Sequence, residues 1–246
     1  MGYIKPNRGI PTRVAALFTG GKDSTYATIW ALREGLEVVC LVTMIPSNPF
    51  SYMFHSVNVT WTKLQAQALG LRQAVFRTAG VKEEEVDDLE CALKEIKEKY
   101  GIEGVVSGAI LSKYQRQRIE RVCERSGLRC IAPLWGSDQV ELLRRYLREG
   151  MEVIFTGVFA LGLGAEWLGA RLDEDKVRRL KELWRRYGLN PSGEGGEYET
   201  FVLDGPYFSK KVKILKAEKR WMGDWGIYVI EEASLEDKES SYGGGG

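Results

Sequence analysis

Apolar residues in the first half of the chain form short continuous runs that alternate with stretches of helical periodicity. Residues 14–18 form one such run, and residues 36–45 form a second that is rich in β-branched side chains. Continuous runs of this kind are typical of strands buried on both faces of a parallel sheet. Between them, residues 24–33 fit a helix that ends at Gly35, because glycine favours a helix C-terminus. The order strand, helix, strand predicts a βαβ unit.

The same alternation continues to residue 131. Apolar positions spaced by three and four residues predict a helix over 86–100, and acidic residues precede it, where they complement the helix dipole. The pattern also predicts helices over 59–69 and 112–126, and strands over 73–78, 104–107 and 129–131. Alternating strands and helices favour an α/β fold with a doubly wound parallel sheet.

The pattern changes after Pro133. We expect a helix over 138–148, a strand over 152–158, a charged helix over 175–187, a glycine-rich loop, and two strands over 211–221 and 225–231. Gly223 and Asp224 between the last two strands predict a hairpin. We therefore expect a first domain at 1–132, a second, smaller α+β domain at 133–239, and a disordered glycine-rich tail at 240–246.

The charges of the chain nearly cancel, with 35 Lys and Arg against 34 Asp and Glu and a formal net charge of +1. A balanced chain has no overall field that attracts nucleic acid or an anionic membrane, so we expect neither as a partner. The first residues carry no apolar segment, and the longest apolar run, over 153–165, is too short to cross a bilayer.

The chain has one histidine, His55, and four cysteines, Cys40, Cys91, Cys123 and Cys130, without a C-x-x-C pair. One histidine cannot form a multi-histidine metal cluster, and the cysteines lie in apolar stretches that suit small buried thiols. We therefore expect a cytoplasmic protein with reduced thiols. Most zinc sites and most hydrolases with a histidine-activated nucleophile are excluded.

A polar segment follows the first predicted strand and consists of Thr19, Gly20, Gly21, Lys22, Asp23 and Ser24. At this position the free N–H groups and the positive end of the next helix form an anion site. Gly20 and Gly21 let the backbone approach an anion closely, and Lys22 adds a positive charge. The hydroxyls of Thr19 and Ser24 are short donors. The segment therefore predicts a phosphate site.

Two common phosphate-binding motifs, the Walker A loop and G-x-G-x-x-G, do not fit this segment. In a Walker A loop a glycine would replace Ala16, and Ser or Thr would replace Asp23 after the lysine. The G-x-G-x-x-G pattern is absent as well. The alternative without a ligand is a glycine turn in which Asp23 or Ser24 only caps the helix.

A second segment, over 190–200, is dense in glycines and carboxylates. Within seven residues it holds Glu194, Glu197 and Glu199 together with three glycines. Such carboxylates can hold a cation, Mg²⁺ or an incoming ammonium ion. The alternative is a solvated acidic loop, since loops are often polar and rich in glycine.

Both segments resemble motifs of known families. Residues 19–24 resemble the S-G-G-x-D-S loop of the N-type ATP pyrophosphatases, which have a HUP-like PP-loop fold, although Thr19 replaces the usual serine and keeps the hydroxyl. Residues 194–200 resemble the E-G-G-E-Y/F-E-T motif of the diphthine–ammonia ligases, a branch of that superfamily. With matching residues at 106–110, 114–115, Arg118, Glu120, 133–135 and 167–169, the similarity extends from about residue 13 to residue 208.

The resemblance implies a reaction. An enzyme of this family uses ATP and ammonium to convert diphthine, a modified histidine of translation elongation factor 2, into diphthamide. The carboxylate of diphthine is adenylated, pyrophosphate leaves, and ammonia displaces AMP, so the protein need not supply a nucleophile. Free ammonium is the expected donor because a glutaminase unit finds no room in the chain.

The resemblance and the positions of the motifs also imply site residues. Catalysis is expected from Lys22, Asp23, Glu194, Glu197 and Glu199. ATP and pyrophosphate are expected to contact residues 19–24 and, at the ends of neighbouring strands and in the helix that follows, Ser107, Gly108, Gln115 and Arg118. Met44 is expected beside the adenine. Mg²⁺ is expected to be carried by ATP. A quaternary ammonium favours aromatic faces, so we expect the substrate to contact His55, Trp135, Trp167, Gly195, Gly196, Tyr198 and Thr200.

Two other functions remain open at this point. A tRNA-modifying adenylating enzyme of the same superfamily would need a positively charged face with exposed aromatic side chains. A non-catalytic ATP sensor would bind nucleotide without releasing pyrophosphate. Sulfur transfer is disfavoured because Cys123 and Cys130 resemble core positions.

Overall fold

The computed structural model describes residues 12–47, 57–81 and 83–238. His55 and the expected tail at 240–246 lie outside the described residues.

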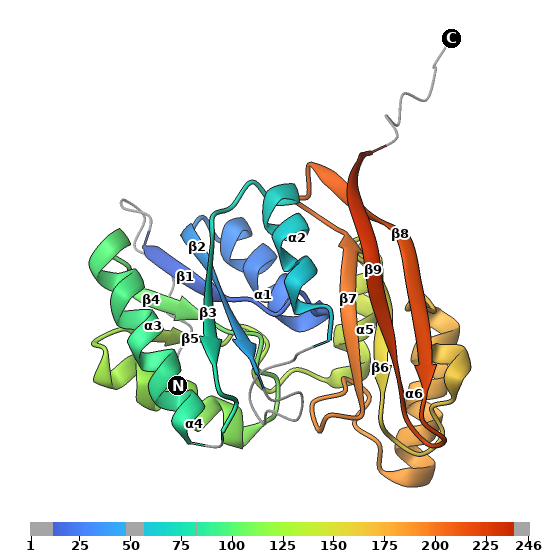
Figure 1. Cartoon of the computed structure of the whole chain (residues 1–246). Coiled ribbons are helices and arrows are strands. Elements are labelled where there is room, and N and C mark those ends of the chain that lie inside the picture. Colours follow the sequence, from blue (N-terminus) through green and yellow to red (C-terminus); the bar gives the residue numbers. More distant parts are fainter. Residues whose placement is uncertain (1–11, 48–56, 82, 239–246) are drawn as a thin grey trace.

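The first half of the chain forms a five-stranded parallel sheet (Figure 1). Its strands follow one another across the sheet in the order β3 (Gln73–Thr78), β2 (Glu37–Pro46), β1 (Arg13–Leu17), β4 (Gly104–Val106) and β5 (Arg129–Ile131). β2 and β3 therefore lie on one side of β1, and β4 and β5 lie on the other side, so the strand order reverses between β1 and β4. Open α/β sheets bind ligands at such a switch point, beyond the carboxyl ends of the strands.

Helices cover both faces of this sheet (Figure 1). α1 (Lys22–Arg33) and α2 (Thr62–Ala68), the latter preceded by the 3-10 turn η1 (Val59–Trp61), share one core cluster with the sheet. α3 (Glu84–Tyr100) and α4 (Lys113–Arg125) share the cluster on the opposite face. Val86, Leu89, Leu93 and Ile96 all point into that cluster, as their spacing predicts. The predicted doubly wound α/β fold is confirmed.

The second half forms a four-stranded antiparallel sheet in the order β7 (Tyr198–Asp204), β6 (Glu152–Val158), β9 (Gly226–Asp237) and β8 (Lys210–Trp221). α5 (Gln139–Arg148) and α6 (Glu174–Tyr187) cover one face, and the 3-10 turn η2 (Ala165–Trp167) follows β6 (Figure 1). Side chains of η1 and α2 pack on the other face, against Ile154, Phe201 and Ile230. α2 therefore lies between the two sheets.

Most predicted elements are confirmed, with three differences. We did not predict β7, because its apolar residues follow the glycine-rich segment as one short run without alternation. β9 continues to Asp237, beyond the expected end at residue 231. α1 begins at Lys22 rather than at Ser24, because Gly21 is its N-cap. The hairpin is confirmed by the hydrogen bond from Met222 N–H to Trp225 O at 2.8 Å.

One hydrophobic cluster joins the two halves. It includes Val14 and Phe18 from the first sheet, and Tyr146, Phe155 and Trp167 from the second half. The two sheets thus share a continuous core, and the boundary near residue 132 remains a prediction.

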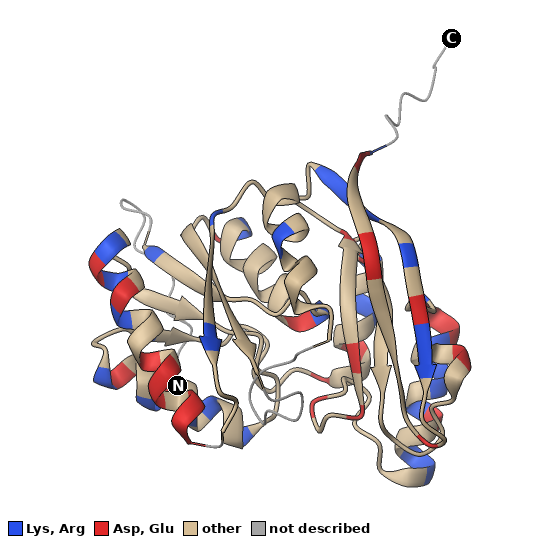
Figure 2. Ribbon diagram, in the orientation of Figure 1, with Lys and Arg blue, Asp and Glu red and all other residues tan. Residues whose placement is uncertain are grey.

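Basic and acidic side chains are interspersed over the surface (Figure 2). β8 is the most basic strand, but its neighbour β9 carries the acidic partners, as in the ion pairs Lys213–Glu236 and Lys216–Glu231. No helix within the described ranges is both long enough and apolar enough to span a bilayer.

Candidate active site

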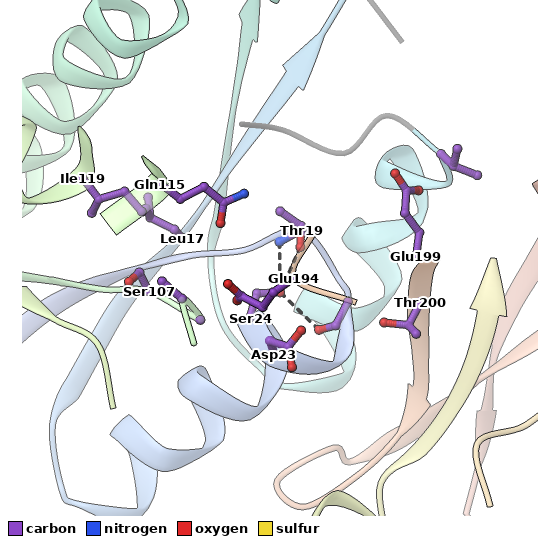
Figure 3. A pocket seen from close by; sticks show the side chains of 14 residues that line it. Leu17, Thr19, Asp23, Ser24, Ser107, Gln115, Ile119, Glu194, Glu199 and Thr200 are labelled. Carbon is purple, nitrogen blue, oxygen red and sulfur yellow. Dashed lines mark hydrogen bonds between the residues drawn. The ribbon is translucent and has the colours of Figure 1, made fainter. Parts of the chain in front are cut away.

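A pocket lies at the switch point between β1 and β4 (Figure 3). Four segments far apart in the sequence meet there, namely the end of β1 with the turn after it, Val57 before η1, the segment from the end of β4 into α4, and the start of β7 with the glutamate-rich loop before it. The lining residues are Leu17, Thr19, Gly21, Asp23, Ser24, Val57, Ser107, Gly108, Ala109, Gln115, Ile119, Glu194, Glu199 and Thr200. The structure therefore brings together the two segments that sequence analysis identified separately.

The turn after β1 is fixed by contacts from α2 and β7. Gly20 has φ = +77°, which favours glycine, and a Cβ there would lie 2.3 Å from Gln65 Oε1. Gln65 Nε2 donates to Gly20 O at 2.9 Å and to Val202 O at 2.7 Å. Thr19 N–H donates to Ser24 Oγ at 3.2 Å and closes the turn. The hydroxyls of Thr19 and Ser24 lie 3.1 Å apart on the pocket wall.

The N-terminus of α1 opens onto the same pocket. Its N-cap, Gly21, has no side chain to bind the free N–H groups of the first turn, so the positive end of the helix remains available to an anion. Lys22 N–H donates to Thr200 Oγ1 at 3.1 Å. A Cβ on Gly108 would lie 2.7 Å from Ser24 N, so the end of β4 packs backbone against backbone on this turn.

The side chain of Lys22 lies beside the pocket rather than in its lining. It is 3% exposed, and its Nζ donates to Ser192 O at 2.5 Å and to Asp23 Oδ2 at 2.7 Å. The same ammonium lies 5.0 Å from the centre of the Tyr198 ring. Lys22 therefore joins the turn to the loop before β7, whereas the sequence suggested a charge that faces phosphate directly.

Asp23 lines the pocket, and a tyrosine from α5 holds its carboxylate. Tyr146 is fully buried, and its hydroxyl donates to Asp23 Oδ1 at 2.7 Å. Burial and the nearby carboxylate raise the pKa of Tyr146 well above its usual value, so the hydroxyl stays protonated. Sequence analysis missed Tyr146 because it lies on the apolar face of a helix, where it resembles an ordinary core residue.

The three glutamates of the loop have different surroundings. Glu194 accepts hydrogen bonds from the N–H groups of residues 110, 111 and 112 at 2.9, 3.1 and 2.7 Å. Burial raises the pKa of Glu194 even though these bonds favour its ionised form. Glu197 accepts from Asn190 N at 3.0 Å and from Gly195 N at 2.8 Å, and so closes its own loop. Glu199 lies on the pocket wall (Figure 3).

These carboxylates do not converge on one point. Within the described part of the chain, no group of three or more His, Cys, Asp or Glu side chains is placed to hold a metal ion.

Two of the aromatic residues expected at the substrate are core residues. Trp167 is fully buried and packs edge-on against Phe155, with ring centres 5.0 Å apart. Tyr198 is 3% exposed and donates to Pro191 O at 2.6 Å. Because neighbours cover both rings, neither can form the expected cage. Trp135 is half-buried, with the Arg116 guanidinium 4.2 Å from its ring centre.

A different aromatic pair lies beside Glu199. Phe159 is 40% exposed and stacks on Trp225, with ring centres 6.0 Å apart. Its N–H donates to Glu197 O at 2.9 Å. The Phe159 ring occupies the space over Gly157, where a Cβ would lie 2.7 Å from the ring and 3.4 Å from Glu199 Cβ. Sequence analysis missed this pair because only the pairing of Gly157 with Glu199 and the turn before β9 bring the two rings together near Glu199.

The other expected residues divide between the pocket and its surroundings. Ser107, Gly108, Gln115 and Thr200 line the pocket, whereas Met44 is buried in the core beneath α3. Arg118 is also outside the lining. Its guanidinium group pairs with Glu83, and its Cζ lies 3.3 Å from the centre of the Tyr114 ring. Gly195 and Gly196 are exposed in the loop, and Cys123 and Cys130 do not line the pocket.

Two matches to known domains cover most of the chain. Residues 12–130 match the diphthamide synthase N-terminal domain, and residues 138–235 match the diphthamide synthase C-terminal domain. The chain belongs to the diphthamide synthase family. This confirms the resemblance inferred from the two motifs.

Two mammalian diphthine–ammonia ligases align with the chain over most of their length. The diphthine–ammonia ligase of Rattus norvegicus is 41% identical over 225 residues, which is 84% of each chain. That of Homo sapiens is 39% identical over 228 residues, again 84% of each chain. A solved structure of a predicted subunit of tRNA methyltransferase from Methanocaldococcus jannaschii has 19% identity and a TM-score of 0.43, and the alignment covers 79% of this chain and 98% of that chain.

Proposed function

We propose that this chain converts the diphthine residue of translation elongation factor 2 into diphthamide through an acyl-adenylate. The coarser statement follows from the family: the chain is an ATP-dependent ligase that amidates diphthine in diphthamide synthesis. One observation supports the finer statement, namely the pocket in which the open end of α1 faces Glu199 and Thr200. We place the reaction in the cytoplasm, where the free thiols of the described cysteines stay reduced.

The phosphates of ATP bind at the turn after β1. The N–H groups at the start of α1 and the hydroxyls of Thr19 and Ser24 bind the β and γ phosphates, because all of these donors face one pocket. Ser107 and Gln115 line the adjoining wall and contact the nucleotide. Lys22 acts indirectly, through Asp23 and Ser192.

Asp23 is the residue that fits Mg²⁺. An ionised carboxylate offers about four lone-pair sites, and two hydrogen bonds leave acceptor capacity toward the pocket. Mg²⁺ commonly binds one or two carboxylates together with substrate phosphates, so it does not need a site made of protein groups alone. When bound, it would neutralise phosphate charge.

The acceptor side of the pocket receives diphthine. Its carboxylate oxygen attacks the α phosphorus of ATP, the bond between the α phosphorus and the bridging oxygen breaks, and pyrophosphate leaves on the positive end of α1. The nitrogen of ammonia then attacks the carbonyl carbon and loses a proton, and AMP leaves with the carboxyl oxygen. Glu199 lines the pocket close to Phe159, where it would hold the incoming ammonium ion and accept a proton from it, so that the ammonia formed can attack.

The trimethylammonium group of the substrate lies on the Phe159–Trp225 pair. A quaternary ammonium is attracted to aromatic faces, and the Glu199 carboxylate next to Phe159 adds an opposite charge. This pair replaces Trp167 and Tyr198 as the aromatic contact.

The test mixes the chain with ATP, ammonium and diphthine-bearing elongation factor 2. We expect AMP and pyrophosphate, together with the mass decrease that replacement of OH by NH₂ causes in the factor. ADP as the nucleotide product would refute the phosphate assignment. Nucleotide binding without AMP formation would identify an ATP sensor, and salt-sensitive retention on tRNA would identify a tRNA-modifying enzyme.

A further inference from the structure

The carboxylate of Asp23 is held at both oxygens by buried donors. The Tyr146 hydroxyl donates to Oδ1 at 2.7 Å, and Lys22 Nζ donates to Oδ2 at 2.7 Å. Tyr146 is 0% exposed and Lys22 is 3% exposed. Neither side chain lines the pocket, whereas Asp23 does. The two donors thus fix the orientation of a carboxylate that faces the site.

Tyr146 has little freedom to do anything else. Its ring packs at 4.8 Å from that of Tyr26, with an angle of 53° between the ring planes, and lies inside the core cluster shared by both sheets. A buried hydroxyl needs an acceptor, and Asp23 is the acceptor that it has.

We propose that Tyr146 is a positioning residue, which keeps the Asp23 carboxylate turned toward the pocket so that it can receive the cation carried by ATP. Without the phenol, only Lys22 would hold the carboxylate, and Asp23 would turn toward that ammonium and away from the pocket. Tyr146 belongs to α5, outside both sequence motifs, so the second half of the chain sets the geometry of the nucleotide site. The inference rests on the proposed function only in taking Mg-ATP as the ligand.

The chain contains a matched control. Tyr26 is also buried and also donates to a carboxylate, Glu149 Oε1 at 2.6 Å, but Glu149 does not line the pocket. Tyr146→Phe and Tyr26→Phe therefore remove the same group from adjacent rings, and only the first removes a contact to the nucleotide site.

The experiment measures the affinity of the full chain for ATP by titration calorimetry, with Mg²⁺ and with EDTA, alongside thermal unfolding. We expect Tyr146→Phe to weaken Mg-ATP binding by about tenfold, as is typical when an outer partner of a metal ligand is lost, and to leave binding in EDTA within about twofold. Tyr26→Phe should leave both affinities unchanged. Equal affinity of Tyr146→Phe and wild type for Mg-ATP, or an equal loss in Tyr26→Phe, would refute the proposal.

A double variant separates positioning from a general loss of packing. In an Asp23→Asn background, Tyr146→Phe should produce no further loss of Mg-ATP affinity, because the group that it positions is already changed. An additional tenfold loss there would overturn the inference. Neither titration uses the protein substrate, so a wild-type chain that binds Mg-ATP without amidating diphthine would refute the proposed function alone.

Discussion

At the scale of single residues, the site depends on how closely backbone segments approach one another. Gly20 and Gly108 lie where a Cβ would contact Gln65 or the backbone of Asp23 and Ser24 at under 3 Å. Such contacts hold the turn after β1 against α2 and β4 and keep the start of α1 open. The geometry of the proposed phosphate site should therefore be sensitive to the addition of a single methyl group.

Gly108→Ala should disrupt the proposed nucleotide site. The new Cβ would lie 2.7 Å from Ser24 N, and because backbone cannot move aside cheaply, the end of β4 must separate from α1. We expect a loss of about 1–3 kcal/mol in the free energy of unfolding, and Mg-ATP affinity at least tenfold weaker by calorimetry.

Gly205→Ala is the control for this substitution. Its Cβ would meet the flexible Met151 side chain at 3.3 Å, away from the pocket. We expect nearly unchanged Mg-ATP affinity, and an equal loss in both variants would contradict the role given to Gly108.

Thr200 tests the contact between β7 and the start of α1. Its Oγ1 accepts the Lys22 N–H, so Thr200→Val, which keeps the shape, leaves this N–H without its partner. We expect Mg-ATP affinity to fall about fivefold and Thr200→Ser, which retains the oxygen, to restore it. Equal affinities for the valine and serine variants would show that the hydrogen bond is not needed.

Sequence predicted which residues meet at the site better than it predicted how they act. The positions of residues 19–24 and 107–108 follow from the order of strands, since both segments end neighbouring parallel strands. The direction of the Lys22 side chain does not follow, because it depends on Ser192 and Tyr198, which only the tertiary fold brings close. Tyr146 was missed for the same reason.

At the scale of elements, α1 is tied to α5 by a small polar cluster. Glu149, just after α5, accepts from Tyr26 at 2.6 Å and from Arg33 at 2.5 Å, both on α1.

β7 was the element that sequence missed, and it carries Glu199 and Thr200 into the pocket. A short apolar run after glycines has no period that separates strand from loop, so its partner strand β6 decides its conformation.

The cluster at Glu149 predicts a specific acid sensitivity. Burial opposes ionisation of Glu149, but the hydrogen bonds from Arg33 and Tyr26 outweigh it and lower its pKa below the usual 4.5. A carboxyl group with a lowered pKa stabilises the fold fully above its unfolded pKa, and this contribution is lost as the pH falls through the folded pKa. Stability should therefore decrease with falling pH in the range below about 4.5.

Glu149→Gln should remove this part of the pH dependence. In urea unfolding, we expect the variant to be less stable than wild type at about pH 7, and the difference to shrink as the pH falls through the lowered pKa of Glu149, because the protonated carboxyl group is then neutral like the amide of Gln. A difference between the two proteins that stays constant over this range would show that Glu149 titrates alike in the folded and unfolded chains.

At the scale of the whole molecule, the contacts that we propose for the nucleotide and for the protein substrate lie in different halves of the chain. The turn after β1 follows a strand of the first sheet, whereas Phe159, Trp225 and Glu199 lie in the second half of the chain. Changes on the second sheet should therefore affect the protein substrate separately from ATP.

Phe159→Ala should raise the KM for diphthine-bearing elongation factor 2. Loss of one aromatic face that contacts a cation is worth about 1–2 kcal/mol, so we expect an increase of about five- to thirtyfold, with unchanged Mg-ATP affinity. Trp184→Ala removes another exposed aromatic, 49% exposed on α6, and serves as the control. Similar KM values for Phe159→Ala and wild type would contradict the proposed contact.

The core shared by the two sheets limits how this protein can be recombined. Val14 and Phe18 pack in the same cluster as Phe155 and Trp167, although the family's two domain signatures meet between residues 130 and 138. A chimera made at that junction from two homologues would join apolar surfaces that evolved separately. The halves are thus not interchangeable modules, and a functional exchange requires transplanting the matching interior residues with them.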